Sequence, residues 1–130
     1  MSTREAISTD AAPAAAGPYS QAIRTGDLVF TAGQLGLDPA TGEFVGADVG
    51  AQAEAALRHV GAILEAAGSG LDRLVKVTVF LAEIGDWPAV NEVYARLVPE
   101  PYPARSAFAV KDLPKGARVE IEAVATVAAG

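Results

Sequence analysis

The sequence contains no cysteine and only one histidine, and these two absences exclude several kinds of site. Without cysteine the chain has no disulfide, no thiolate nucleophile and no cysteine-ligated zinc or iron–sulfur centre. A Ser-His-Asp triad or a histidine metal site would depend on His59, which falls within a predicted helix, so we interpret it as a packing or surface residue. We therefore expect no metal, and any chemistry has to come from carboxylates, arginine, hydroxyls and backbone groups.

Basic residues are also scarce. The 130 residues include 10 Lys and Arg against 16 Asp and Glu, which gives a formal net charge of −6, and the basic residues form no cluster. Because nucleic-acid binding normally needs a positive patch to displace counterions, we expect no nucleic-acid partner. No apolar run has the length of a membrane span, and the segment through Ala16 lacks the order of a secretory signal. We expect no membrane partner and a cytoplasmic location.

What the sequence does contain is typical of one folded domain. Hydrophobic residues make up 51% of the chain and charged residues 20%, which argues against disorder. No repeat, linker or composition change divides the chain, so we expect a single domain over residues 1–130.

Two segments have the apolar spacing of amphipathic helices. The first follows Asp48, a predicted N-cap, and ends at Gly68-Ser69-Gly70. Its apolar face comprises Ala53, Ala56, Leu57, Val60, Ile63, Leu64 and Ala67. The second follows Asp86, also a predicted N-cap, and ends before the prolines at 99, 101 and 103. Its apolar face comprises Val90, Val93, Tyr94 and Leu97.

The remaining segments indicate a sheet. We predict strands at about residues 4–8, 20–24, 28–32, 74–81, 104–110 and 118–127, and a loop at 33–46. The order of strands, helix, strand, helix and strands predicts an α+β fold, a two-layer sandwich with two helices on one face of a mixed sheet.

Alternation along the strands groups their side chains into two faces. We expect the helices to cover the face with Val75, Val77, Val79, Val119, Ile121 and Ala123. We expect the other face to carry Phe80, Thr78, Arg105, Ala107, Glu120 and Val124. This second face is too apolar to be wholly solvated and too polar for an ordinary core, so we expect a partner to cover it.

Arg105 is the first candidate for chemistry. It shares a strand face with Ala107 and Ala109, so a long cation stands beside two small residues. A guanidinium does not deprotonate in proteins, and its planar fork fits a bound carboxylate in a bidentate manner. The alternative is a structural salt bridge to Glu120 or Glu122, and chemistry and spacing alone leave the two interpretations open.

Glu120 and Glu122 are the second candidates. They alternate with Val119, Ile121 and Ala123 in an otherwise apolar strand. A carboxylate in such a strand is a candidate for acid–base work, because burial raises its pKa.

Five short motifs lie far apart in the chain and are specific only when taken together. They are Gly17-Pro18-Tyr19-Ser20-Gln21-Ala22, Val29-Phe30-Thr31-Ala32-Gly33-Gln34, Pro103-Ala104-Arg105-Ser106, Leu113-Pro114-Lys115-Gly116-Ala117 and Val119-Glu120-Ile121-Glu122-Ala123. The sequence that carries them, from about Ile7 to Val127, resembles the Rid (YjgF-like) family of imine and enamine deaminases, in particular its RidA-like members.

The resemblance implies a chorismate-mutase-like fold and a homotrimer with sites in the clefts between subunits. It also implies hydrolysis of small enamine and imine acids, such as 2-aminoacrylate and 2-iminopropanoate, to a 2-keto acid and ammonia without a cofactor. The implied catalytic residues are Arg105, which holds the substrate carboxylate, and Glu120, which positions a water. The implied substrate-binding residues are Arg105, Tyr19, Asn91, and the backbone N–H groups of Gly33 and Ala107.

Two positions depart from the usual pattern of the family. Ala32 stands where serine is common, which removes a hydroxyl, and Ala107 stands where cysteine is common. The first alternative function is therefore a non-catalytic protein that binds or senses a small carboxylate. The second is a ribonuclease or translation inhibitor, against which the net charge of −6 and the single histidine argue.

Overall fold

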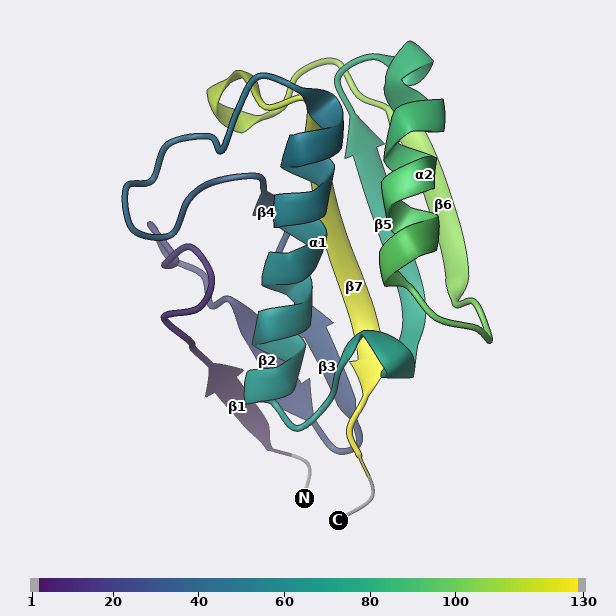
Figure 1. Ribbon diagram of the computed structural model, residues 1–130. Coiled ribbons are helices and arrows are strands. Elements are labelled where there is room, and N and C mark those ends of the chain that lie inside the picture. The colour runs from purple at the N-terminus through teal and green to yellow at the C-terminus, as the bar shows by residue number, and fades with distance from the viewer. Residues whose placement is uncertain (1–2, 129–130) are drawn as a thin grey trace.

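The computed structural model describes residues 3–128, in which two helices pack on one face of a sheet (Figure 1). The strands are β1 (Arg4–Ile7), β2 (Ala22–Thr25), β3 (Leu28–Thr31), β4 (Gln34–Leu35), β5 (Leu74–Leu81), β6 (Ala104–Ala109) and β7 (Val119–Thr126). The helices are α1 (Val49–Ala66) and α2 (Trp87–Leu97), with short 3-10 turns at Leu71–Arg73, Ile84–Asp86 and Pro114–Gly116. The predicted two-layer α+β fold is confirmed.

The sheet is mixed and ends in a parallel pair. Its strand order is β1-β2-β3-β7-β5-β6, and β4 pairs with β7. The β5–β6 pair is parallel, and every other pair is antiparallel. The crossover between the two parallel strands contains α2, which explains why this helix lies over their end of the sheet (Figure 1). Strand β6 therefore forms a free edge beside α2.

Helix α1 begins where the sequence predicts. The Asp48 carboxylate accepts a hydrogen bond of 3.0 Å from the backbone N–H of Ala51, which is the expected N-cap. All seven residues of the predicted apolar face are buried: Ala53, Ala56, Leu57, Val60, Ile63, Leu64 and Ala67. This face forms the core with the inward side chains of β5 and β7.

Asp86 occupies the predicted N-cap position of α2, but its side chain makes no cap hydrogen bond. Its two carboxylate oxygens instead accept hydrogen bonds of 2.9 Å each from the guanidinium of Arg118. Because charge-assisted bonds to a guanidinium are stronger than a single bond to a backbone N–H, the carboxylate turns to Arg118.

One residue of the predicted core face also points outward. Val77 and Val79 are fully buried, as expected, but the exposed fraction of Val75 is 44%. The pairing of β5 with β7 shifts register between Leu74 and Lys76, and this bulge breaks the alternation. The expectation for Val75 is therefore wrong because a bulge is not visible in a period-two pattern.

The predicted face of Arg105 and Ala107 is wrong as well. In the parallel β5–β6 pair, Arg105 lies opposite Val77, and Ala107 lies opposite Val79. Residues opposite each other in a sheet point to the same side, so both side chains lie on the face that the helices cover. The open face carries Phe80 and Glu120, as predicted, together with the β6 residues that alternate with Arg105.

The open face of the sheet is rich in exposed apolar side chains. Leu28, Phe30 and Phe108 have exposed fractions of 37%, 43% and 45%. The ring of Phe108 stands edge-on to Phe80, with 5.5 Å between the ring centroids. Figure 1 shows both helices on the other side of the sheet. No described helix within residues 3–128 has the length and apolar character needed to span a membrane.

The segment after β3 was predicted as a loop, but it contains β4 and a buried anchor for α1. The Nε2 atom of His59 lies 2.6 Å from the carbonyl oxygen of Leu37, and His59 is buried. Burial lowers the pKa of His59, and the bond to Leu37 opposes that shift. The interpretation of this histidine as a packing residue is confirmed.

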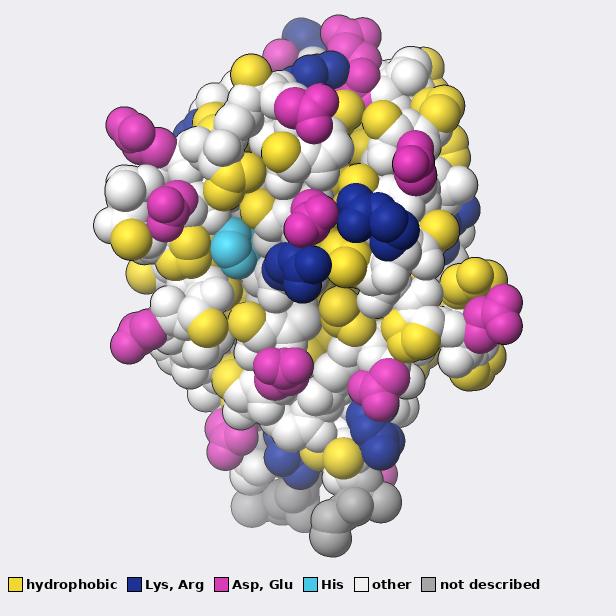
Figure 2. Space-filling model, in the orientation of Figure 1, with side chains coloured by type: hydrophobic (Ala, Val, Ile, Leu, Met, Phe, Trp, Pro, Cys, Tyr) yellow, Lys and Arg dark blue, Asp and Glu magenta, His cyan; other side chains and the backbone are white. Residues whose placement is uncertain are grey.

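Charges on the helix face are paired rather than gathered by sign. Glu54 of α1 accepts bonds from Arg58 at 3.2 Å and from Arg96 of α2 at 3.3 Å. Figure 2 shows acidic and basic side chains interspersed over this face of the molecule. The face therefore presents no broad field of one sign.

Candidate active site

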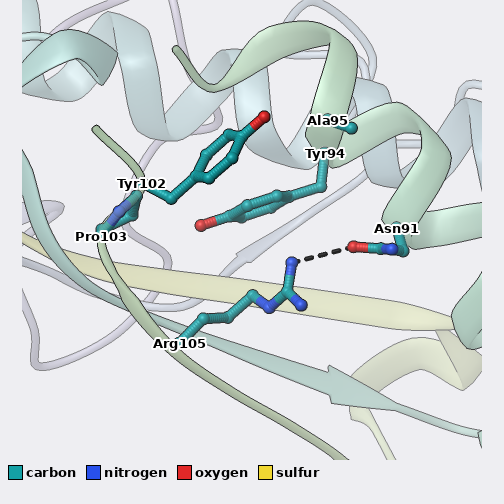
Figure 3. A pocket seen from close by; sticks show the side chains of 6 residues that line it. All are labelled: Asn91, Tyr94, Ala95, Tyr102, Pro103 and Arg105. Atoms are coloured by element: carbon teal, nitrogen blue, oxygen red, sulfur yellow. Dashed lines mark hydrogen bonds between the residues drawn. The ribbon is translucent and has the colours of Figure 1, made fainter. Parts of the chain in front are cut away.

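Arg105 lies at the edge of the sheet, against α2. Its Nη1 donates a hydrogen bond of 2.9 Å to Oδ1 of Asn91. Its guanidinium carbon lies 4.6 Å from the centroid of the Trp87 ring and 4.8 Å from that of the Tyr94 ring. Figure 3 shows the Arg105 side chain reaching from β6 toward Tyr94 and Asn91. The structure thus brings together two predicted site residues, Arg105 and Asn91.

No carboxylate within residues 3–128 forms an ion pair with this guanidinium. Among residues 3–128, the arginines that form ion pairs are Arg58, Arg96 and Arg118. The alternative of a salt bridge from Arg105 to Glu120 or Glu122 is therefore wrong. A guanidinium has five N–H donors, and one of them is engaged with a neutral amide here. The remaining donors are suited to an external anion.

A cavity of about 370 Å³ opens beside Arg105. Its lining residues are Asn91, Tyr94, Ala95, Tyr102, Pro103 and Arg105, and Figure 3 shows them around the hollow. The lining combines aromatic and apolar surface with one cation and one amide. This composition fits a small organic acid that has its carboxylate at Arg105.

The backbone of Ala107 adds a donor at the same edge. The N–H of Val110 donates to the carbonyl of Leu81 on β5 at 2.9 Å. Because N–H groups alternate in direction along a strand, the N–H of Ala107 points away from β5, out of the free edge of β6. The predicted backbone role of Ala107 is compatible with this position.

Glu120 and Gly33 form a second group on the open face. Phe30 pairs with Val124, but Gln34 pairs with Ile121, so the segment between β3 and β4 contains one extra residue opposite β7. This bulge places Gly33 directly against Glu120, and a Cβ atom at Gly33 would overlap the Glu120 carboxylate. Glycine is therefore the residue that the close approach requires.

The surroundings of Glu120 shift the pKa of its carboxyl group. Burial raises the pKa of Glu120, and the negative charge of Glu122 on the same strand face raises it further. A carboxylate with a raised pKa is a better proton acceptor than an ordinary surface glutamate.

Tyr19 belongs with the second group by its place in the chain. It lies on the loop before β2 with an exposed fraction of 53%, and its hydroxyl accepts a bond of 3.3 Å from the N–H of Ala16. The carbonyl of Gln21 accepts a bond of 2.8 Å from the N–H of Ala32. This bond ties the loop that carries Tyr19 to the segment that carries Gly33.

Within one chain the two groups are separated. Arg105 lies on β6 and Glu120 on β7, with β5 between them, and they point to opposite faces of the sheet. Strand spacing and rise place their Cα atoms about 14 Å apart. The structure therefore assembles Arg105, Asn91 and Ala107 at one place, and Glu120 and Gly33 at another.

The sequence analysis missed Trp87 as a contact of Arg105 and assigned Tyr94 only to the core. The sequence held one indication that these residues lie together: Trp87, Asn91 and Tyr94 are spaced at i, i+4 and i+7, which places them on one face of a helix. The spacing did not show that Arg105 would face this side, since that depends on the pairing of β6 with β5.

The sequence and the fold both match known proteins. A protein-family model described as Endoribonuclease L-PSP matches residues 9–127. The chain belongs to the Rid family. This family includes a relative from Sinorhizobium fredii named RutC family protein y4sK, which is 56% identical over 120 residues, or 92% of this chain and 95% of that protein. A second relative, from Capra hircus, is named 2-iminobutanoate/2-iminopropanoate deaminase and is 51% identical over 94% of this chain and 89% of that protein.

A solved Rid structure shares the same fold. The crystal structure of E. coli TdcF with bound serine superposes with a TM-score of 0.90 at 41% sequence identity, covering 95% of this chain and 99% of that one. The expected Rid fold is thus confirmed by sequence and by structure.

Proposed function

We propose that the protein hydrolyses small 2-imino acids and their enamine tautomers to 2-keto acids and ammonia. The observation that carries the proposal is the guanidinium of Arg105, which has no carboxylate partner among the described residues and borders a cavity. Support also comes from the relatives named as 2-iminobutanoate/2-iminopropanoate deaminases and from the serine bound to E. coli TdcF, which is a small amino acid.

The proposed mechanism uses only groups of the protein and water. Arg105 and the N–H of Ala107 hold the substrate carboxylate and so fix the imine carbon. Glu120 accepts a proton from a water whose oxygen attacks that carbon, and the C=N double bond becomes a C–N single bond. Glu120 passes this proton to the nitrogen and then relays the proton of the new hydroxyl group to the nitrogen as well, so that the C–N bond breaks, the C–O bond becomes the keto group and ammonia leaves.

Glu120 can act on a substrate held at Arg105 only if it comes from a second copy of the chain. The two side chains lie on opposite faces of one sheet. The open face that carries Glu120 is also rich in exposed apolar side chains, which a second copy would cover. The resemblance to the Rid family supplies the number of copies, and we propose a homotrimer with a site at each subunit boundary.

We predict that two inactive variants restore each other's activity when mixed. Arg105→Ala lacks the carboxylate anchor and Glu120→Gln lacks the proton acceptor. If every site takes one residue from each of two chains, random hybrid oligomers regain about a quarter of the wild-type sites. The measurement is ammonia release after the two variants are dissociated and reassembled together, with each variant reassembled alone as the control.

Absence of recovery in hybrids of confirmed composition would contradict a shared site. Light scattering gives the number of copies.

A charge on the open face, Phe80→Glu, is expected to dissociate the assembly and abolish turnover, because Phe80 packs against Phe108 on that face. A fully active monomer would refute the assembly.

We also predict the acidic limb of the pH profile. Glu120 must be ionised to accept a proton, and burial together with Glu122 raises its pKa above the ordinary 4.5. Activity should therefore rise with pH through a midpoint above 4.5. Glu122→Gln removes the charge that raises this pKa, so its midpoint in kcat/KM is expected at lower pH. If the midpoint of Glu122→Gln is unchanged, the acidic limb of the pH profile does not report the ionisation of Glu120.

The direct test of function is catalysed release of ammonia from an imine made in situ. An amino-acid oxidase converts alanine to 2-iminopropanoate, and the protein is expected to speed formation of pyruvate and ammonia above the rate in water. Binding of 2-oxobutanoate without such acceleration would favour the alternative of a non-catalytic carboxylate-binding protein. Cleavage of RNA by wild-type protein but not by Arg105→Ala would favour the ribonuclease alternative.

A further inference from the structure

Arg105 differs from the structural arginine of this fold in the groups that hold it. The guanidinium of Arg118 donates to both oxygens of Asp86 and to the carbonyl of Ala47, so its charge is matched within the chain. The guanidinium of Arg105 is instead held by the neutral oxygen of Asn91 and by the rings of Trp87 and Tyr94. No carboxylate among the residues that the structure describes takes part in holding it.

We propose that Trp87 and Tyr94 are positioning residues that hold the guanidinium of Arg105 through their ring faces and leave its N–H edge free for a substrate carboxylate. The inference rests on the proposed carboxylate role of Arg105. An aromatic ring attracts a guanidinium through its π face, whereas a carboxylate binds the planar edge. The two interactions use different sides of the same group, so both rings and substrate can be engaged together.

The placement of Tyr94 supports this role beyond simple packing. Its exposed fraction is 4%, and its buried hydroxyl has no hydrogen-bond partner among the described residues. Figure 3 shows its ring between Tyr102 and the guanidinium of Arg105. The ring lines the cavity and contacts the cation at once. Removal of the ring should therefore affect binding of anions, and removal of the hydroxyl alone should not.

The fluorescence of Trp87 gives a direct readout of carboxylate binding at Arg105. It is the only tryptophan of the chain, and its ring centroid lies 4.6 Å from the guanidinium carbon of Arg105. Binding of a carboxylate at Arg105 should change the intrinsic fluorescence of the protein. The same titration of Arg105→Met should give no change, because the anion site is lost while the indole stays.

The decisive experiment measures the affinity for 2-oxobutanoate by titration calorimetry, independently of turnover. In Trp87→Leu and in Tyr94→Leu we expect the dissociation constant to rise about three- to tenfold, the range that a cation–π contact typically supports. Trp87→Phe keeps an aromatic face and should recover most of the affinity. In the kinetic assay the loss should appear in KM, with kcat changed less than about twofold.

The matched control is Val93→Ala in the same helix. Val93 is buried in the core and is not among the residues that line the cavity, so this variant loses core packing while keeping both rings. It should lower thermal stability and leave the dissociation constant unchanged. Tyr94→Phe should bind like wild type, and a tenfold loss in this variant would overturn the role of the ring.

The outcomes separate this inference from the proposed reaction. Wild-type affinity in Trp87→Leu and Tyr94→Leu overturns the positioning role, even if the protein is an active deaminase. Ring-dependent binding without ammonia release supports the positioning role and overturns the deaminase. Equal losses in Val93→Ala and Trp87→Leu would assign the effect to helix packing and overturn the inference.

Discussion

Arg105→Ala is expected to lower kcat/KM for 2-iminopropanoate about 10²- to 10⁴-fold while the fold stays intact. The loss follows from two charge-assisted hydrogen bonds to the substrate carboxylate, each of which contributes about 1.5–3 kcal/mol. Stability should change little, because Arg105 is exposed and forms no ion pair among the described residues. The measurements are steady-state ammonia release and thermal unfolding.

Two further variants sharpen this test. Arg105→Lys keeps the charge but not the planar fork, so it should restore only a small part of the activity. Arg96→Ala is the matched control, since Arg96 lies on α2 and forms an exposed pair with Glu54 at 3.3 Å. It should leave kcat/KM unchanged. Near-normal activity in Arg105→Ala would remove the central claim about the site.

Glu120→Gln is expected to lower kcat at least about tenfold while the affinity for 2-oxobutanoate is retained. The amide keeps the shape of the side chain against Gly33 but cannot accept a proton from water. Turnover and binding are measured separately, by ammonia release and by calorimetry. Glu122→Gln is the control, because Glu122 shares the strand face with Glu120 and is expected to keep near-normal turnover at neutral pH.

The same variant has a predictable effect on stability. The pKa of Glu120 is raised in the folded chain, so the charged carboxylate is disfavoured there relative to the unfolded chain. Stability that is present when Glu120 is protonated is therefore lost as the pH rises through its folded pKa. Glu120→Gln lacks this loss and should be at least as stable as wild type at neutral pH. In the turnover assay, unchanged activity of Glu120→Gln together with a large loss of activity in Glu122→Gln would assign the proton transfer to Glu122.

Much of the fold follows from local patterns. The apolar spacing of α1 and the strand limits of β5 depend on residues a few positions apart, and both agree with the structure. The cap at Asp48 is also local, since its partner Ala51 is three residues away. The capping role of Asp86 failed because its competitor, Arg118, lies 32 residues further along the chain.

The candidate site could be predicted residue by residue but not as an arrangement. The resemblance to the Rid family pointed to Arg105, Glu120, Gly33 and Asn91, and the structure pairs Arg105 with Asn91 and Glu120 with Gly33. The fit of Gly33 against Glu120 needs the bulge between β3 and β4. A bulge depends on which strands pair and on the register of the pairing. The sequence of a single strand determines neither the partner nor the register.

The sequence by itself determined the family, the two-layer α+β fold and the chemical character of the candidate residues, because motifs and periodicity are properties of the chain. Only the tertiary structure decided the face on which each residue lies. Alternation correctly grouped Arg105 with Ala107, but it cannot say whether such a group meets the helices or the open side. The parallel pairing of β6 with β5 places Arg105 opposite Val77, whereas the antiparallel pairing of β7 with β5 places Glu120 opposite Phe80. Residues paired across neighbouring strands point to the same side of a sheet. Arg105 therefore points to the side of Val77, and Glu120 points to the opposite side, with Phe80.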